Sequence, residues 1–180
     1  MNNLKLKLCK ICLQEFEPIK PLQVSCSYKC ALDYARGKIA KKVKAENKVK
    51  KERMKTKSQH LKELQVIFNK YIRTRDSQEP CISCRTKSNV KYDAGHYIAV
   101  SESPALRFNE DNVHKQCSNY CNVNKSGNYH AYRFHLIDKI GVERVEALES
   151  SRHIPIHLSI PEIDELKTIY KNKIKDLLQK

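Results

Sequence analysis

Four pairs of closely spaced cysteines constrain this sequence more than any other feature. The cysteines of each pair are separated by two or three residues, and in a reducing compartment such pairs favour metal ligands over disulfides. Two pairs supply the four thiolates of one tetrahedral zinc site, so the eight cysteines predict two structural zinc ions. The first predicted site consists of Cys9, Cys12, Cys26 and Cys30. The second predicted site consists of Cys81, Cys84, Cys117 and Cys121.

The composition argues against one large apolar core. The 180 residues are 40% hydrophobic and include no Trp, so we expect small modules stabilised by metal. The fold class expected is α+β and mostly helical. Its expected parts are a zinc module at 1–35, a basic and amphipathic helical arm at 36–75, a second zinc module at 76–135 and C-terminal helices at 136–180.

The net charge predicts a polyanionic partner. Lys and Arg number 35 against 20 Asp and Glu, which gives +15, and nucleic acid is the commonest partner of such a chain. The sequence has no apolar run near the roughly 20 residues of a membrane span. Its first residues, MNNLKLKLCKIC, alternate Leu with Lys, unlike a signal peptide. We therefore expect a cytoplasmic protein that has no membrane partner.

Positive charge is densest in residues 36–57, which contain eleven Lys or Arg and two Glu. The segment lacks Pro and can form a long solvated helix. It can be a linker, an arm that binds phosphates, or both, because a basic linker beside DNA still releases counterions. The candidate phosphate contacts in this segment are Lys41, Lys42, Lys44, Lys48, Lys50, Lys51 and Arg53.

Three further segments have helical patterns. Apolar residues recur at helical spacing from Leu61 to Ile72, a face that we expect to pack in a core. Two short helices should meet at Gly141. The last helix should begin with a capping box of Ser159 and Glu162. Its apolar stripe consists of Ile163, Leu166, Ile169, Tyr170, Ile174 and Leu177.

Polar residues that can perform chemistry gather between the third and fourth cysteine pairs. Four thiolates would fill the second zinc site and leave no position on that ion for His96 or His114. We expect His96 on a strand, packed against a helix that carries Asn122 and Lys125 on one face. Hydrolysis of a phosphodiester needs a base, a metal ion and a cation near the phosphate, and this segment contains candidates for each.

This pattern resembles the zinc-stapled HNH, or ββα-metal, nucleases. The residues that carry the resemblance are Cys81, Cys84, Asp93, His96, Asn112, Cys117, Cys121, Asn122 and Lys125. A closer resemblance is to the NinG/Rap family of phage recombination proteins. It rests on the strings PCISC, DAGHY, LRFNEDNVHKQC and CNxxKSGN, which follow a cysteine module and a Lys-rich segment, and it covers residues 9–175.

The resemblance implies a treble-clef-like ββα-metal module and a DNA endonuclease that acts on branched recombination intermediates such as D-loops and four-way junctions. The expected location is the cytoplasm of a bacterial host. By the same resemblance, His96 is the general base and Asn112 holds the loop that orients it. Asn122 ligates the catalytic Mg²⁺ or Mn²⁺, and Lys125 is the cation beside the phosphate.

Four residues near this constellation have less defined roles. Asp93 lies three positions before the base, whereas the family's acidic ligand directly precedes it. A bulge at Gly95 would bring Asp93 to the metal. Without a bulge, Asp93 would contact a residue that binds the metal and would not bind the metal itself. His114 is open to core packing, phosphate contact or chemistry. Arg107 and Lys115 are candidates for phosphate contact.

Two other functions fit the sequence. One is a non-catalytic zinc adaptor that binds branched or single-stranded DNA and recruits recombination proteins. The other is a structural protein that assembles through its helical stripes. A homodimer would suit symmetric cleavage of a four-way junction, but the sequence has no long heptad repeat that indicates one.

Overall fold

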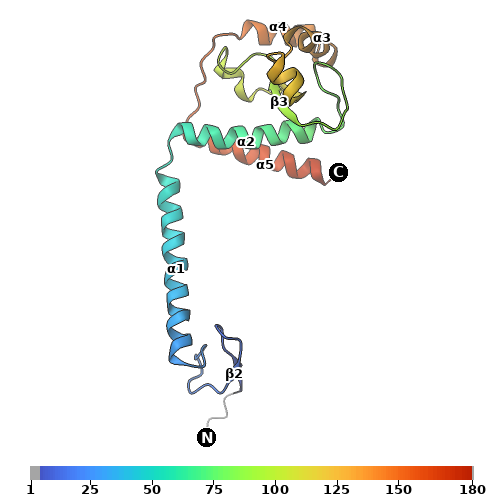
Figure 1. The fold of residues 1–180 in the computed structure, drawn as a ribbon. Coiled ribbons are helices and arrows are strands. Elements are labelled where there is room, and N and C mark those ends of the chain that lie inside the picture. The colour runs from blue at the N-terminus through green and yellow to red at the C-terminus, as the bar shows by residue number, and fades with distance from the viewer. Residues whose placement is uncertain (1–4, 180) are drawn as a thin grey trace. The chain divides into compact units, whose positions relative to one another are not determined.

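The structure is a computed structural model that describes residues 5–179. The chain divides into two compact units, Met1–Lys55 and Thr56–Lys180, which we call the N-terminal and C-terminal units (Figure 1). The structure is an α+β fold, mostly helical, with one four-cysteine cluster in each unit. Within residues 5–179, no helix is both long enough and apolar enough to cross a membrane.

The N-terminal unit begins with a small hairpin and continues into a long helix. Strands β1 (Lys7–Leu8) and β2 (Glu15–Phe16) pair antiparallel, and α1 (Tyr28–Arg53) follows. The Ser27 side chain caps α1 by accepting a hydrogen bond from the backbone N–H of Cys30 at 3.3 Å. The second cysteine pair, Cys26 and Cys30, therefore lies at the start of the helix.

Helix α1 is solvated along its length. None of its residues is buried, and its Ala, Lys, Glu and Arg residues have high helix propensity. The last turn contains Lys50, Lys51 and Arg53, which complement the negative end of the helix dipole. The prediction of a long solvated basic helix is confirmed, and all seven candidate phosphate contacts of this segment are exposed.

A second helix starts directly after the boundary between the units. Helix α2 (Lys57–Arg75) begins with a capping box, in which Thr56 and Gln59 each bond the other's backbone N–H. The sequence predicted a single basic and amphipathic arm over 36–75 that includes this segment. The structure divides the chain twenty residues earlier, because the apolar face of α2 is buried in the C-terminal unit.

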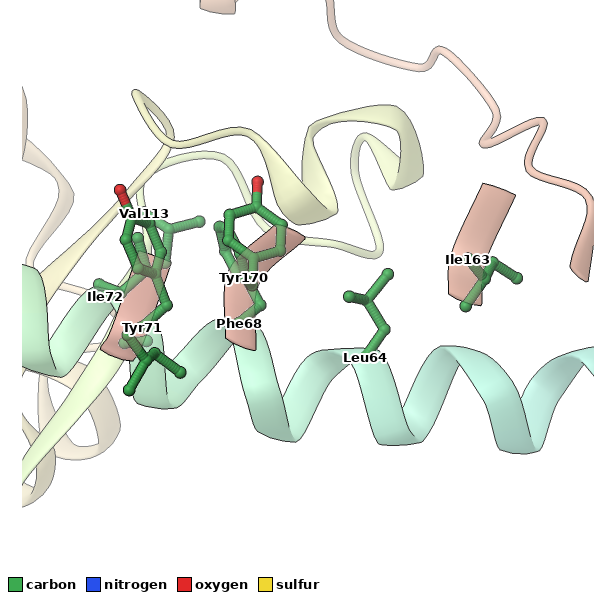
Figure 2. Close-up of a cluster of buried hydrophobic side chains, with 9 residues drawn as sticks. Leu64, Phe68, Tyr71, Ile72, Val113, Ile163 and Tyr170 are labelled. Carbon is green, nitrogen blue, oxygen red and sulfur yellow. The ribbon is translucent and has the colours of Figure 1, made fainter. Parts of the chain in front are cut away.

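The first core of the C-terminal unit forms where α2 packs along α5 (Ile160–Leu178) (Figure 2). Phe68 is fully buried at its centre, and its ring meets the Tyr170 ring edge-on with centroids 4.9 Å apart. The capping box of Ser159 and Glu162 starts α5 as predicted. The buried residues of this core are Leu64, Phe68, Tyr71, Ile72, Ala94, Val113, Ile163, Tyr170 and Ile174.

A β-hairpin contributes to this core and carries most of the candidate site. Strands β3 (Tyr92–His96) and β4 (Val113–Cys117) pair antiparallel, and the 3₁₀ helix η1 (Pro104–Phe108) lies in their connection. Pairing runs unbroken from Tyr92 to His96, so no bulge forms at Gly95. The π-helix η2 (Ser118–Asn124) follows β4 directly.

The second core lies beneath two short helices. Helices α3 (Tyr129–Ile140) and α4 (Val142–Ser150) meet at Gly141, whose φ of 87° suits glycine, and the predicted break is confirmed. The Tyr132 hydroxyl donates to the Gly95 carbonyl at 2.9 Å and thereby ties α3 to β3. The buried residues of this core are Ile82, Tyr97, Ile98, Leu106, Tyr132, Leu136, Val145 and Leu148.

Candidate active site and metal centres

The eight cysteines gather into the two predicted sets of four. Cys9, Cys12, Cys26 and Cys30 form one cluster. Cys81, Cys84, Cys117 and Cys121 form the other. In each cluster the sulfur atoms all lie within 4.8 Å of one another. Four thiolates bound to one zinc ion lie about 3.8 Å apart, so both clusters are consistent with zinc sites.

In the N-terminal cluster the surroundings of Cys9 favour its thiolate. The Sγ atoms of Cys12 and Cys26 are 3.4 Å apart, and those of Cys26 and Cys30 are 3.8 Å apart. Hydrogen bonds from the backbone amides of Cys12 and Ile11 lower the pKa of Cys9 to about 6. Because metal binding requires deprotonated cysteines, this environment suits a cation.

The C-terminal cluster is more enclosed, since three of its four cysteines are buried. The Sγ atom of Cys117 lies 3.7 Å from the Sγ atoms of both Cys81 and Cys84. Burial opposes the Cys81 thiolate, but backbone amides, including those of Cys84 and Cys117, outweigh it and lower the pKa of Cys81. This cluster joins the 81–84 turn to the end of β4.

The π-helix explains how the fourth cysteine pair accommodates three intervening residues. Cys117 ends β4 and Cys121 lies inside η2, so both of their positions are fixed by the cluster. A π-turn contains about one more residue than an α-turn, and it can absorb the extra residue of the Cys-x-x-x-Cys spacing. The helix expected after Cys121 is therefore a short π-helix, and Lys125 lies at its C-cap instead of one turn along it.

His96 is held in one orientation and one neutral tautomer. Its Nε2 lies 3.0 Å from the Arg107 carbonyl oxygen, which can only accept, so Nε2 carries the proton and Nδ1 has the lone pair. Nδ1 has no hydrogen-bond partner in residues 5–179. Nδ1 is not fully buried, because Gln116 Oε1 is the only fully buried side-chain nitrogen or oxygen there without a partner. Burial lowers the pKa of His96 and favours the neutral ring.

Asn112 ties together the loop that supplies this carbonyl. Its side chain is fully buried, and its Oδ1 accepts from the Ile98 N–H at 2.8 Å. Its Nδ2 donates to the carbonyls of Ile98 and Leu106 at 3.0 and 3.1 Å. Because Leu106 precedes Arg107, Asn112 fixes the segment that orients the His96 ring.

Asp93 and Asn122 come together on the other face of β3. Asp93 Oδ2 accepts hydrogen bonds from Ser118 Oγ at 2.5 Å and from Asn122 Nδ2 at 3.2 Å. In residues 5–179, Asp93 Oδ1 and Asn122 Oδ1 accept no hydrogen bond, which leaves two neighbouring oxygens for a cation. Carboxylate and amide oxygens are the ligands that a hard divalent ion prefers. Ser118 was not singled out in the sequence, where a lone serine carries no motif.

His96 is separated from this pair. Alternate residues of a strand share a face, so Asp93 and His96 project from opposite faces of β3, about 10 Å apart along the strand. In the described part of the chain, no hydrogen bond or ion pair joins His96 to Asp93, Asn122 or Lys125. The structure thus brings together Asp93 with Asn122, and His96 with the Asn112 loop.

The candidate phosphate contacts around the site differ in accessibility. The Lys125 ammonium is exposed and lies 4.4 Å from the centroid of the Tyr120 ring. Arg107 is half-buried and donates through Nε to Gln65 Oε1 at 2.6 Å, which leaves its two terminal nitrogens for another partner. Lys115 is buried, and its ammonium donates to the Ser77 carbonyl, so its charge faces the protein interior.

His114 belongs to a buried polar network. Its Nε2 donates to the Asp111 carbonyl at 3.1 Å, so its Nδ1 accepts from Arg75 at 2.9 Å. Arg75 also holds the carboxylate of Asp76 through Nε at 2.8 Å, although Asp76 is buried. Burial raises the pKa of Asp76, but the hydrogen bonds from Arg75 and from the Lys115 N–H, together with the positive charge of Arg75, outweigh that effect and lower it. This network joins the end of α2 to β4, and no sequence motif indicated it.

The comparisons with known proteins agree on one family. A family model described as the bacteriophage lambda NinG protein matches residues 1–180. The chain is 45% identical to protein ninG of Escherichia phage lambda over 130 residues, which cover 72% of this chain and 63% of that protein. It is 42% identical to protein ninG of Salmonella phage P22, with the same coverage.

A third relative matches over more of its length. Protein ninG of Escherichia phage 933W is 37% identical over 187 aligned positions, which cover 94% of this chain and 92% of that protein. The chain thus spans less than two thirds of the lambda and P22 relatives and nearly all of the 933W relative. No solved structure matches the chain. The family model matches the whole sequence, and the chain therefore belongs to the NinG family of phage proteins.

Proposed function

We propose that this chain is a divalent-metal-dependent DNA endonuclease of the HNH, or ββα-metal, type. It would hydrolyse phosphodiesters in branched recombination intermediates, D-loops or four-way junctions, in the host cytoplasm. The hairpin of β3 and β4 and the π-helix η2 would form the ββα-metal module around the second zinc site.

One observation carries this proposal, the arrangement of Asn112, Arg107 and His96. A general base needs a free lone pair, a fixed direction and a pKa that keeps it neutral at the working pH. The ring of His96 is bonded at Nε2, has Nδ1 unbonded and not fully buried, and has a lowered pKa. A structural histidine would use both nitrogens, as His114 does.

In the proposed reaction, Nδ1 of His96 accepts a proton from the water that attacks phosphorus, as the bond to the leaving oxygen breaks. Asn112 keeps the 98–106 loop closed so that the Arg107 carbonyl holds the ring in this direction. Lys125, which is exposed, would contact a phosphate.

Asp93 and Asn122 would hold the catalytic ion, Mg²⁺ or Mn²⁺. Their two unbonded oxygens lie on one side of the hairpin and have the hard character that these ions require. When bound, such an ion stabilises the charge that develops on the phosphate and the leaving oxygen. Gly95 is the residue directly before the proposed base. Asp93 lies two residues before Gly95, on the same face of β3 as Gly95 and further along the strand from His96.

The exposed helix α1 would bind the DNA backbone. Its lysines and arginines all lie in solvent, which leaves them free to replace counterions along a duplex. Arg107 would add a contact beside the active site. Lys115 is not part of this surface, because its ammonium donates a hydrogen bond to the Ser77 carbonyl.

The separation of His96 from Asp93 and Asn122 favours a second candidate, a zinc-dependent DNA-binding adaptor that does not cleave. One experiment distinguishes the two functions. Purified protein is incubated with labelled linear, Y-form, D-loop and four-way DNA, with and without Mg²⁺. The endonuclease proposal requires cleavage of branched DNA that depends on added Mg²⁺; binding of the same DNAs without cleavage would establish the adaptor instead.

A further inference from the structure

A groove of about 450 Å³ opens beside the second cysteine cluster, within the size range of small-ligand sites. It lies where the 84–91 turn faces the start of η2. The residues that shape it are Thr86, Ser88, Val90, Lys91, Ser118 and Tyr120. None of the proposed catalytic residues lines this groove.

The groove presents a flat apolar surface to solvent. The Tyr120 side chain is 54% exposed and Val90 is 48% exposed. The hydroxyls of Thr86 and Ser88 lie 2.8 Å apart in the wall of the groove and offer hydrogen bonds. An aromatic ring, an aliphatic wall and a few hydroxyls suit a flat ring system that has polar edges.

Positive charge lies around this apolar surface. Lys91 lines the groove and is exposed, and the Lys125 ammonium lies 4.4 Å from the Tyr120 ring centroid. In the 84–125 region no carboxylate lines the groove. A nucleotide within a DNA strand has these features, because its base is a flat ring system and the phosphates on either side of it are negatively charged.

The groove adjoins the proposed metal ligands. Ser118 lines the groove, and its Oγ donates to Asp93 Oδ2. Tyr120 and Asn122 lie two residues apart in the same π-helix. A strand bound in the groove would therefore continue toward Asp93 and Asn122.

We propose that this groove binds an unpaired nucleobase of a DNA strand, which stacks on Tyr120 while the neighbouring phosphates contact Lys91 and Lys125. This inference rests on the proposed function and specifies its substrate. In a duplex the faces of the bases are covered by their neighbours, so a single aromatic side chain can stack only on a base that is already unpaired or flipped out. The groove would thus give the protein a preference for the unpaired positions at a branch.

Binding of full-length, zinc-loaded protein to labelled oligonucleotides, measured by fluorescence anisotropy without added Mg²⁺, tests this proposal. The readout is the ratio of affinity for a single strand to affinity for a duplex of equal length. Tyr120→Ala should lower the single-strand affinity roughly 5- to 100-fold, the range for loss of one stacked base, and leave duplex affinity unchanged. Tyr120→Phe should keep the ratio.

Phe134→Ala is the matched control. Phe134 is 65% exposed on α3, outside the groove, and its removal should leave the ratio unchanged. Val90→Glu provides a second variant in case Tyr120→Ala fails to keep its zinc, since a carboxylate in the groove would repel the phosphates. If either variant, with both zinc ions bound, kept the wild-type ratio of single-strand to duplex affinity, the inference would be wrong. The groove would then be a site for an apolar side chain of a protein partner.

The outcomes for this inference and for the endonuclease proposal are separate, because the assay measures binding without cleavage. A protein that shows Tyr120-dependent preference for single strands but cleaves no branched DNA with Mg²⁺ would support the groove and contradict the endonuclease. A protein that cleaves branched DNA while Tyr120→Ala leaves the affinity ratio unchanged would do the reverse.

Discussion

Gly95 shows how one residue between the candidate base and the candidate metal ligand is constrained by packing. A Cβ atom at this position would lie 2.3 Å from Gln116 Oε1 and 2.9 Å from Gln116 Cβ. The Gln116 side chain is fully buried, and its Nε2 donates to Ser83 Oγ at 2.7 Å and to the Gly127 carbonyl at 2.5 Å. Gln116 therefore fills the space that a side chain at residue 95 would need.

Gly95→Ala should destabilise the C-terminal unit by about 1–3 kcal/mol, since an inserted methyl group must displace a packed, hydrogen-bonded side chain. Thermal unfolding followed by circular dichroism measures the change. Gly37→Ala is the matched control: nothing lies within 4 Å of a Cβ at that position, and alanine favours a helix. An equal melting temperature for Gly95→Ala and wild type would contradict the packing role.

The lowered pKa of His96 predicts the pH dependence of cleavage. Desolvation lowers this pKa and outweighs the hydrogen bond to the Arg107 carbonyl, which raises it. The base works only when neutral, so the rate should stay constant as pH falls to 6.5, the usual histidine pKa, and decline only below it. Single-turnover cleavage from pH 5 to 8, with zinc content measured at each pH, checks this. An inflection above pH 6.5 would assign the base elsewhere.

At the level of single residues, the sequence predicted the grouping of the cysteines better than the contacts of individual polar side chains. The Asn112 clamp follows from the family pattern, and the predicted grouping of the eight cysteines is confirmed. The Ser118 contact with Asp93 and the burial of Lys115 depend on strand register and on the turn at Ser77. Such contacts join residues 25 and 38 positions apart, and local patterns do not encode them.

Helices α2 and α5 show how well periodicity predicts an element and how poorly it predicts a boundary. Their apolar stripes were read from the i, i+3, i+4 spacing, and both stripes pack in one core (Figure 2). Two residues of the predicted α5 stripe, Ile169 and Leu177, lie outside this core and are 41% and 36% exposed. The break between α1 and α2 was missed because Lys and Met residues continue the helical pattern through it. The capping box of Thr56 and Gln59 was a signal that could have located it.

The π-helix η2 was not predictable in the same way. Local sequence favours a π-turn only weakly. Here both ends of the segment are held by contacts with other parts of the chain. Cys117 is held by pairing with β3 and by the cluster, and Cys121 by the cluster and by a hydrogen bond from the Gly127 N–H to its carbonyl. The backbone between them takes the form that fits three residues, a consequence of metal-site geometry.

Phe68→Ala should destabilise the C-terminal unit by about 3–5 kcal/mol, the usual cost of removing a fully buried aromatic ring. Phe68 is fully buried, and its ring centroid lies 4.9 Å from that of Tyr170 and 5.7 Å from that of Phe108. Urea unfolding gives the difference. Val66→Ala, on the same helix with a side chain that is 70% exposed, should change stability little. Similar losses in the free energy of unfolding for Phe68→Ala and Val66→Ala would show that Phe68 is not at the centre of the core.

For the whole molecule, the two units differ in charge and in the way they are stabilised. Residues 1–55 contain 15 Lys and Arg against five Asp and Glu, a net charge of +10 out of the total of +15. The N-terminal unit contains few buried residues apart from its cysteine cluster, whereas the C-terminal unit has two apolar cores as well as its cluster. We therefore expect the N-terminal unit to supply most of the DNA affinity and the C-terminal unit to supply the catalytic residues.

A truncated chain that begins at Thr56 tests this division. It keeps the capping box of α2 and both apolar cores, so it should fold and bind one zinc ion where the full chain binds two. DNA affinity should fall, and the slope of log affinity against log salt should become shallower, because most of the phosphate-binding charge is gone. Elemental analysis and salt titrations measure both quantities. An unchanged salt slope would show that the C-terminal unit alone contacts the DNA backbone.

Cleavage of four-way junction DNA by His96→Ala in the presence of Mg²⁺ tests the central claim most directly. We predict a single-turnover rate at least about 100-fold below wild type, the usual effect of removing a positioned base, with DNA affinity and both zinc ions retained. His130→Ala, which removes an exposed histidine of α3, should cleave at the wild-type rate. Cleavage by His96→Ala at the wild-type rate would contradict the account.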